Sequence, residues 1–205
     1  MDMHKILFSL ARKRPVFHSE ADYQHALAWE IQQRLPEATI RLEMPFQIPE
    51  QLLYIDIWVA YQDKFIAVEL KYKTRNLSVR IDDEQYRLKN QGAQDIGRYD
   101  FLKDIQRLEQ ASKQYKEIMG YAVLLTNDST YWTISNRKTV DAEFRLHNRR
   151  IIAGTLAWGD KASDGTKRKR EQPIELEGTY QLHWEDYSRP SDDRHGRFRS
   201  LVVKV

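Results

Sequence analysis

The sequence predicts an α/β fold with a mixed central sheet flanked by helices. Two observations lead to this prediction. Between about residues 17 and 127 the elements follow the order helix, strand, strand, strand, helix, strand (α-β-β-β-α-β), and the last run, 121–126 (YAVLLT), is continuously apolar. Such a run is typical of a strand buried on both faces of a sheet. Beyond it, short strand-like runs predict a β-rich extension over about 128–205, and we expect a single domain over 1–205.

The composition fits a globular chain with a sizeable core. Of the 205 residues 41% are hydrophobic, and 33 Lys+Arg against 30 Asp+Glu leave a net charge of +3, which permits a nucleic-acid partner without requiring one. The absence of Cys excludes disulfides, Cys-ligated metals and a thiol nucleophile. No apolar run approaches the roughly 20 residues that span a bilayer, and 1–15 has only a short apolar patch, 6–10. We expect a cytoplasmic protein with no membrane partner.

The first predicted helix begins after Ser19 and continues to about Leu35, where Pro36 ends it. Ser19 and Asp22 form a variant of the capping box that satisfies the N–H groups of the first turn. One side of the helix carries an apolar stripe with a spacing of four: Tyr23, Leu27, Ile31 and Leu35. Glu20 lies at the inward edge of the same helix. The positive end of the helix dipole explains an acid there, and so does a role in a site.

Three strands follow this helix. The first alternates apolar and polar residues over 40–44 and is expected to end at Pro45. The second, 52–61, and the third, 65–73 (FIAVELKYK), are joined by a short turn at 62–64, so they are predicted to pair as an antiparallel hairpin.

Charged residues interrupt these two apolar strands at Asp56, Glu69 and Lys71. Burying isolated charges in a sheet costs several kcal/mol unless they are paired or bind a cation. One explanation is structural, with a salt bridge between Glu69 and Lys71 and with Asp56 as a cross-strand partner. The other is a hard, oxygen-ligated ion such as Mg²⁺ joining the two carboxylates, with Lys71 placed to polarise a water molecule for attack on phosphorus.

The remaining elements are less regular. Leu77, Val79 and Ile81 alternate with polar residues, and 82–94 is expected to be an excursion or flexible loop. A helix is predicted from near Asp95 to a stop at Gly120, with one apolar face: Phe101, Ile105, Leu108, Tyr115 and Met119. In the extension, strand-like pieces lie at 131–134, 143–146, 178–184 and 198–203, and an exposed loop is expected at 159–172.

The element order, with Glu20 on the first helix, Asp56 on the second strand and Glu69-x-Lys71 on the third, resembles the PD-(D/E)XK nuclease superfamily, which has the restriction-endonuclease-like fold. The resemblance covers roughly residues 17–127. It implies that Asp56 and Glu69 ligate Mg²⁺ or Mn²⁺, that Glu20 is an auxiliary ligand or orienting group, and that Lys71 activates the water. The Gln-x-x-x-Tyr of one exonuclease-like branch is missing, because Gln94 and Tyr99 are five apart, so no subfamily is assigned.

The expected activity is therefore metal-dependent hydrolysis of phosphodiester bonds in nucleic acid, with DNA the preferred substrate. Candidate phosphate contacts are Lys73 and Arg75, which follow the proposed site, and Gln94 and Arg98 near the start of the second predicted helix. The alternative is an inactive module of the same fold that binds nucleic acid or a protein partner. The scattered His residues lack zinc spacing, and P-loop, dinucleotide and hydrolase-elbow motifs are absent. A homodimer is compatible with cutting both strands of a duplex.

Overall fold

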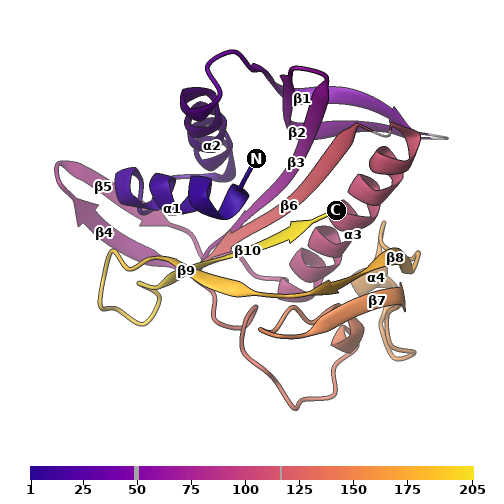
Figure 1. Ribbon diagram of the computed structural model, residues 1–205. Helices are drawn as coiled ribbons and strands as arrows, with labels where there is room; N and C mark the ends of the chain where they lie inside the picture. Colours follow the sequence, from indigo (N-terminus) through magenta and orange to yellow (C-terminus); the bar gives the residue numbers. More distant parts are fainter. Residues whose placement is uncertain (49–50, 116) are drawn as a thin grey trace.

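The computed structural model describes residues 1–48, 51–115 and 117–205 (Figure 1). Within this part of the chain the main sheet has six strands in the order β1-β2-β3-β6-β10-β9. Their bounds are β1 Thr39–Ile48, β2 Gln51–Tyr61, β3 Lys64–Lys73, β6 Ile118–Thr126, β9 Trp184–Ser188 and β10 Phe198–Lys204. β3 and β6 pair in parallel, whereas the other neighbours pair antiparallel. The prediction of an α/β fold with a mixed sheet flanked by helices is confirmed at this level.

Helices cover both faces of this sheet. α1 (Met3–Lys13) and α2 (Glu20–Arg34) pack on one face and α3 (Gln94–Gln114) packs on the other. Side chains of β6 alternate between the two cores: Val123 and Leu125 join the core under α1 and α2, while Ala122 and Leu124 join the core under α3. The prediction that this strand is buried on both faces is therefore confirmed. No helix among the described residues combines the length and apolarity needed to cross a membrane.

The helix predicted after Ser19 is α2, and its cap forms as expected, because the Ser19 side chain accepts a hydrogen bond from the N–H of Asp22. α1 was not predicted. Its buried residues have helical spacing: Met3, Ile6, Leu7 and Leu10. The short apolar patch at 6–10 lies within this amphipathic helix. The helical spacing of the apolar residues, rather than the length of the patch, is the feature that indicates the helix.

β1 does not end at Pro45, as was expected, but continues to Ile48. Pro45 pairs with Tyr54 of β2, and β1 is an edge strand of the sheet. An edge strand tolerates proline because the missing N–H can point away from the ladder. The predicted hairpin between β2 and β3 is confirmed by the antiparallel register from Ile57↔Val68 to Tyr61↔Lys64.

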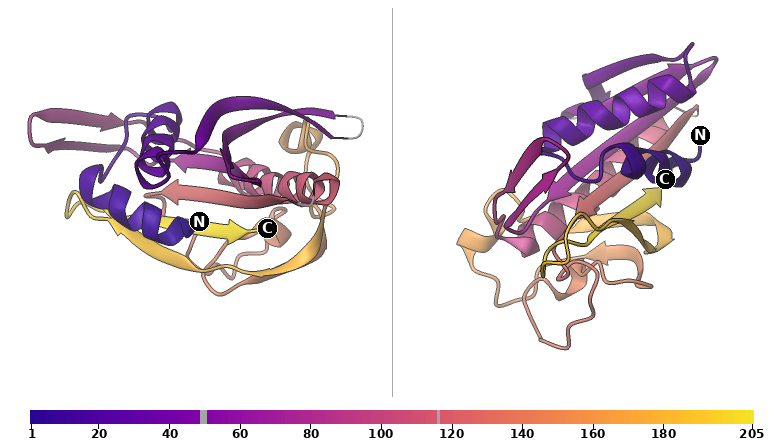
Figure 2. Two further views of the ribbon diagram at one scale, coloured as in Figure 1. Left: turned by 45° about the horizontal axis from the view of Figure 1, so that its top comes forward. Right: turned by 90° about the vertical axis from the view of Figure 1, so that its left-hand side faces the viewer.

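The segment 82–94 is not a loop throughout. β4 (Leu77–Ile81) pairs with β5 (Glu84–Leu88), and the hairpin projects from one end of the molecule (Figure 2). One face of the hairpin is anchored, because Leu77, Tyr86 and Leu88 are buried in the core under α1 and α2. The polar composition of 82–94 hid this alternation.

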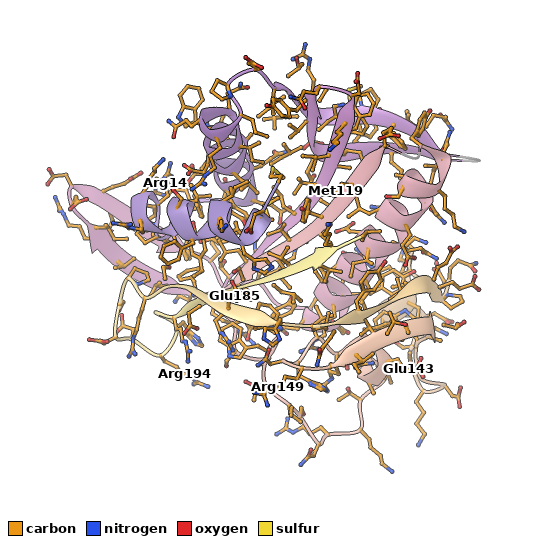
Figure 3. The ribbon with its side chains drawn as sticks, viewed as in Figure 1. Arg14, Met119, Glu143, Arg149, Glu185 and Arg194 are labelled. Atoms are coloured by element: carbon orange, nitrogen blue, oxygen red, sulfur yellow. The ribbon has the colours of Figure 1, made fainter. Side chains whose placement is uncertain are left out.

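α3 ends earlier than the pattern indicated. Its last residue is Gln114, and the N–H of Tyr115 closes the helix on the carbonyl of Ala111. Met119, labelled in Figure 3, lies on β6 rather than on the helix, so the prediction of a helix to Gly120 was wrong. The strand begins at Ile118 because it pairs with β3 from Phe65 onwards. Lys116, inside the predicted helix, lies outside the described residues.

The β-rich extension does two things. β10 and β9 complete the main sheet, and β7 (Ile151–Leu156) and β8 (Ile174–Gln181) form a separate two-stranded sheet, with β8 against α3. The strand predicted at 198–203 is β10, whereas 178–184 combines the end of β8 with the start of β9. The strands predicted at 131–134 and 143–146 were wrong, because the first is a turn and the second overlaps the 3-10 helix η1 (Ala142–Phe144). The loop at 159–172 contains only the short helix α4 (Asp164–Lys167).

Candidate active site

The candidate site lies where β2 separates from β3. Their ladder stops at Ile57↔Val68, one residue before Asp56 would face Glu69. Ile55 packs in the core under α3, while Ile57 packs in the core under α2. In a regular strand residues two apart point to the same side, so β2 departs from regular pleating at Asp56, opposite Glu43, whose φ of 50° interrupts β1. This departure brings the Asp56 side chain to the edge of β3.

Two acids satisfy the N–H groups that β3 exposes beyond the end of this ladder. Asp56 Oδ2 accepts from the N–H of Leu70 at 2.7 Å, and Glu20 Oε2 accepts from the N–H of Tyr72 at 2.7 Å. Alternate N–H groups point to the same side of a strand, so the two acids stand in for the ladder bonds that β2 no longer supplies. Gln24 of α2 holds the other strand by donating to the carbonyl of Asp56 at 2.8 Å.

The side chains of Glu69 and Lys71 belong to the α3 side of β3, where they meet a third acid, Asp104. Lys71 Nζ lies 2.7 Å from Asp104 Oδ2, and Arg107 lies 3.3 Å from Asp104 Oδ1. Glu69 and Asp104 are 4% and 2% exposed, so both acids are buried. The expected structural pair between Glu69 and Lys71 is not among the ion pairs of the described residues, because Lys71 turns to Asp104 instead.

The sequence interpretation missed Asp104. The signal was present, since Asp104 lies three residues after Phe101 and four before Leu108 on the buried face of α3. An acid in that position needs a partner, and Lys71 supplies it.

Burial and like charge raise the pKa values of the acids. Burial, together with the charge of Asp104, raises the pKa of Asp56 to about 6, although Lys71 and the N–H of Leu70 oppose the rise. Burial, followed by the charges of Asp104 and Asp56, holds the pKa of Glu69 well above its usual range. The Asp56 and Glu69 carboxyl groups are within hydrogen-bonding reach of each other, and a hydrogen bond between two carboxyl groups requires a proton on one of them.

The pKa values of the other two charged groups also shift. Burial raises the pKa of Asp104 even though Lys71 lies beside it. Burial would lower the pKa of Lys71, but the negative charges of Asp104 and Asp56 outweigh it and raise the pKa above the ordinary value. Lys71 is therefore a hydrogen-bond donor at neutral pH and not a base.

The donors present suit a hard divalent ion. Asp56 and Glu69 offer carboxylate oxygens within hydrogen-bonding reach of each other, and Mg²⁺ is commonly held by one or two carboxylates together with water and substrate phosphate. Within 1–48, 51–115 and 117–205 no group of three or more His, Cys, Asp or Glu is arranged to hold a metal. Glu20 is thus placed beside β3 without joining Asp56 and Glu69 in such a group.

The predicted phosphate contacts are placed differently from one another. Lys73 is half-buried and has no ion-pair partner among the described residues, whereas Arg75 pairs with Asp128 at 2.8 Å. Gln94 donates to the same Asp128 at 3.0 Å. Arg98 is only 5% exposed and is held by Asp141 at 2.5 Å and by the carbonyl of Thr130 at 2.9 Å, so it lies in a wall and not on an open face.

Comparisons with known proteins add no relative. No protein-family model, no curated protein and no solved structure matches the chain. The fold and the site define an α/β protein with a mixed sheet flanked by helices and with two neighbouring acids, Asp56 and Glu69, beside a lysine.

Proposed function

We propose that the chain is a metal-dependent nuclease of the PD-(D/E)XK type, with a restriction-endonuclease-like core, that hydrolyses phosphodiester bonds in DNA. One observation carries the proposal: Asp56 and Glu69 bring their carboxyl groups within hydrogen-bonding reach of each other, at the point where β2 leaves β3, and burial together with the charge of Asp104 raises the pKa values of both. Two buried carboxylates this close repel each other unless a proton or a cation joins them, and raised pKa values of this kind are typical of functional sites.

Each side chain has a role in this proposal. Asp56 and Glu69 would hold Mg²⁺ or Mn²⁺, an ion that stabilises negative charge on a phosphodiester and lowers the pKa of water. Lys71 stays protonated and donates a hydrogen bond, which would orient the attacking water or stabilise negative charge on the phosphate. Asp104 positions Lys71 through the ion pair at 2.7 Å. Glu20 fixes the edge of β3 at Tyr72.

The second candidate function is an inactive module of the same fold that binds nucleic acid or a protein partner. It is favoured by the ion pair between Lys71 and Asp104, which leaves the ammonium group already occupied. Asp56 and Glu20 also have a purely structural use, because each accepts a hydrogen bond from a backbone N–H of β3. In such a module no divalent ion is needed.

Titration calorimetry of Mg²⁺ and Mn²⁺, with plasmid and single-strand cleavage assays on the same samples, tests the proposal. The test variant is the Asp56→Asn/Glu69→Gln double mutant. The matched control is Asp100→Asn, which makes the same acid-to-amide change on α3, one turn before Asp104, at a residue paired with Arg170. We expect the double mutant to lose metal binding and cleavage and the control to keep both.

Two results would overturn the proposal. Cleavage retained by the double mutant would remove the acid pair from the reaction. A wild-type protein that binds neither ion and cuts no substrate would leave the inactive module as the function of this fold.

A further inference from the structure

A cavity of about 550 Å³ opens at the start of α3, away from the acid pair. Its walls come from the first turns of α3 and from the segment 129–145, which the sequence did not predict correctly. Gln94 and Arg98 line it from the helix, and Arg137 and Arg145 line it from the segment. Residues far apart in the sequence thus build one polar wall.

Two of the three arginines in this wall, Arg98 and Arg145, are held by neighbouring groups. Arg98 is 5% exposed and uses one N–H for Asp141 and one for the carbonyl of Thr130. A guanidinium group has five N–H donors, so Arg98 keeps terminal N–H donors beyond these two contacts. Its Nε is fully buried and has no hydrogen-bond partner in the part of the chain that the structure describes. Arg145 is held by the hydroxyl of Thr139 at 2.7 Å.

The balance of charge in the wall favours an anion. Arg98, Arg137 and Arg145 face two acids, Asp95 and Asp141, so one positive charge is uncompensated. The N-terminus of α3 lines the same cavity with Gln94 and Asp95; its cap residue Ala93 provides no side-chain hydrogen bond, and Asp95 Oδ1 accepts from the N–H of Ile96 at 2.9 Å. Two wall hydroxyls, Ser129 and Thr133, have no side-chain hydrogen bond among the described residues and are open to a ligand oxygen.

We infer that this cavity binds a phosphate group of the nucleic-acid substrate at a distance from the scissile bond. The inference rests on the proposed function. Gln94 and Asp104 are separated by about 15 Å along α3, given a rise of about 1.5 Å per residue. Phosphates of one duplex strand advance about 3.4 Å each along the axis, so a duplex lying along α3 would place in the cavity a phosphate about four nucleotides from the reaction. Its role is to position the substrate and not to react with it.

The test measures binding without cleavage, in EDTA. Inorganic phosphate is titrated into the full chain by calorimetry, and a labelled DNA oligonucleotide is titrated by fluorescence anisotropy at several salt concentrations. The variants are Arg137→Ala and Arg145→Ala, singly and together. Arg137 is exposed, so its variant tests the cavity even where loss of Arg145 disturbs the segment. Arg41→Ala removes the same charge from the exposed side of the edge strand β1 and is the matched control.

We expect the Arg137→Ala/Arg145→Ala protein to bind inorganic phosphate and the oligonucleotide about tenfold more weakly. The Arg41→Ala control should leave both affinities unchanged. The slope of log affinity for the oligonucleotide against log salt concentration should become shallower by about one for each phosphate contact removed. In cleavage assays the double variant should raise KM and keep kcat.

Three results would overturn the inference. The first is wild-type protein that does not bind inorganic phosphate at millimolar concentration. The second is a double variant with unchanged affinity for both ligands. The third is weaker binding of inorganic phosphate with unchanged binding of DNA, because it would assign the cavity to a free phosphate compound. Failure of the nuclease proposal is recognised separately, since it appears as cleavage by the Asp56→Asn/Glu69→Gln protein.

Discussion

Replacing Asp56 by Asn should stabilise the metal-free protein at alkaline pH. Burial raises the pKa of Asp56 to about 6 in the folded state, from an ordinary value of 3.8. One pKa unit corresponds to about 1.4 kcal/mol, so the ionised carboxylate costs the folded state at most about 3 kcal/mol at pH 8. Asn cannot ionise, yet its oxygen can still accept the hydrogen bond from the N–H of Leu70.

The sign of the effect depends on pH. The folded protein keeps the proton of Asp56 up to about pH 6, whereas the unfolded chain loses it near 3.8. Stability of the wild type therefore falls as pH rises between these two values, and the raised pKa of Glu69 acts in the same direction. Below about pH 4 Asp56 is protonated in both the folded and the unfolded wild type, and the stability advantage of the Asn variant disappears.

Urea denaturation and thermal scans in EDTA at pH 4, 6 and 8 measure this difference. For a chain of this size the gain corresponds to a Tm higher by about 6–12 °C at pH 8. Asp100→Asn, which loses an ion pair with Arg170, should show no such gain at any pH. An Asp56→Asn protein that is no more stable than the wild type at pH 8 would refute the argument that the ionised carboxylate of Asp56 is costly in its buried position.

Two further changes test the surroundings of the site. Asp104→Asn should destabilise the protein by about 3 kcal/mol in urea denaturation, because it leaves the ammonium group of Lys71 nearly buried without its partner at 2.7 Å; a loss below about 1 kcal/mol would contradict this dependence. Glu109→Ala should expose the amides of β7 and β8 to hydrogen exchange, because this buried carboxylate accepts from the N–H groups of Glu177 and Gly178 and from the hydroxyl of Tyr180. Unchanged exchange in β8 with normal global stability would contradict that anchoring role.

The sequence predicted the elements with strong local signals. Ser19 and Asp22 marked the start of α2, and the run 121–126 marked the central strand, because a cap and a continuous apolar segment depend on few distant contacts. The charges at Asp56, Glu69 and Lys71 stood out for the same reason, since they interrupt apolar strands.

Other features depend on tertiary contacts. The departure of β2 from regular pleating at Asp56 exists because the two ends of the strand pack in different cores, and no local pattern encodes that division. The segment 129–145 is irregular because Arg98 reaches from α3 to hold Asp141 and the carbonyl of Thr130. Aromatic residues in this segment imitate a strand in the sequence, although Phe144 is buried from a 3-10 helix. The role of Asp104 also depends on a distant contact, because its partner Lys71 lies on β3 and not on the same helix.

The order of strands in the main sheet has a consequence for synthesis of the chain. β6 lies in the middle of the sheet, but its second neighbour, β10, begins about 70 residues later. While a ribosome makes the intervening segment, one edge of β6 has no strand to pair with, and its side chains are among the most apolar of the chain. Unpaired apolar edges promote association between nascent chains, and pairing over a long sequence separation is slow. Fragments that stop before Phe198 should therefore aggregate. The β-rich extension supplies the strand that pairs with the second edge of β6, so it is part of the main sheet.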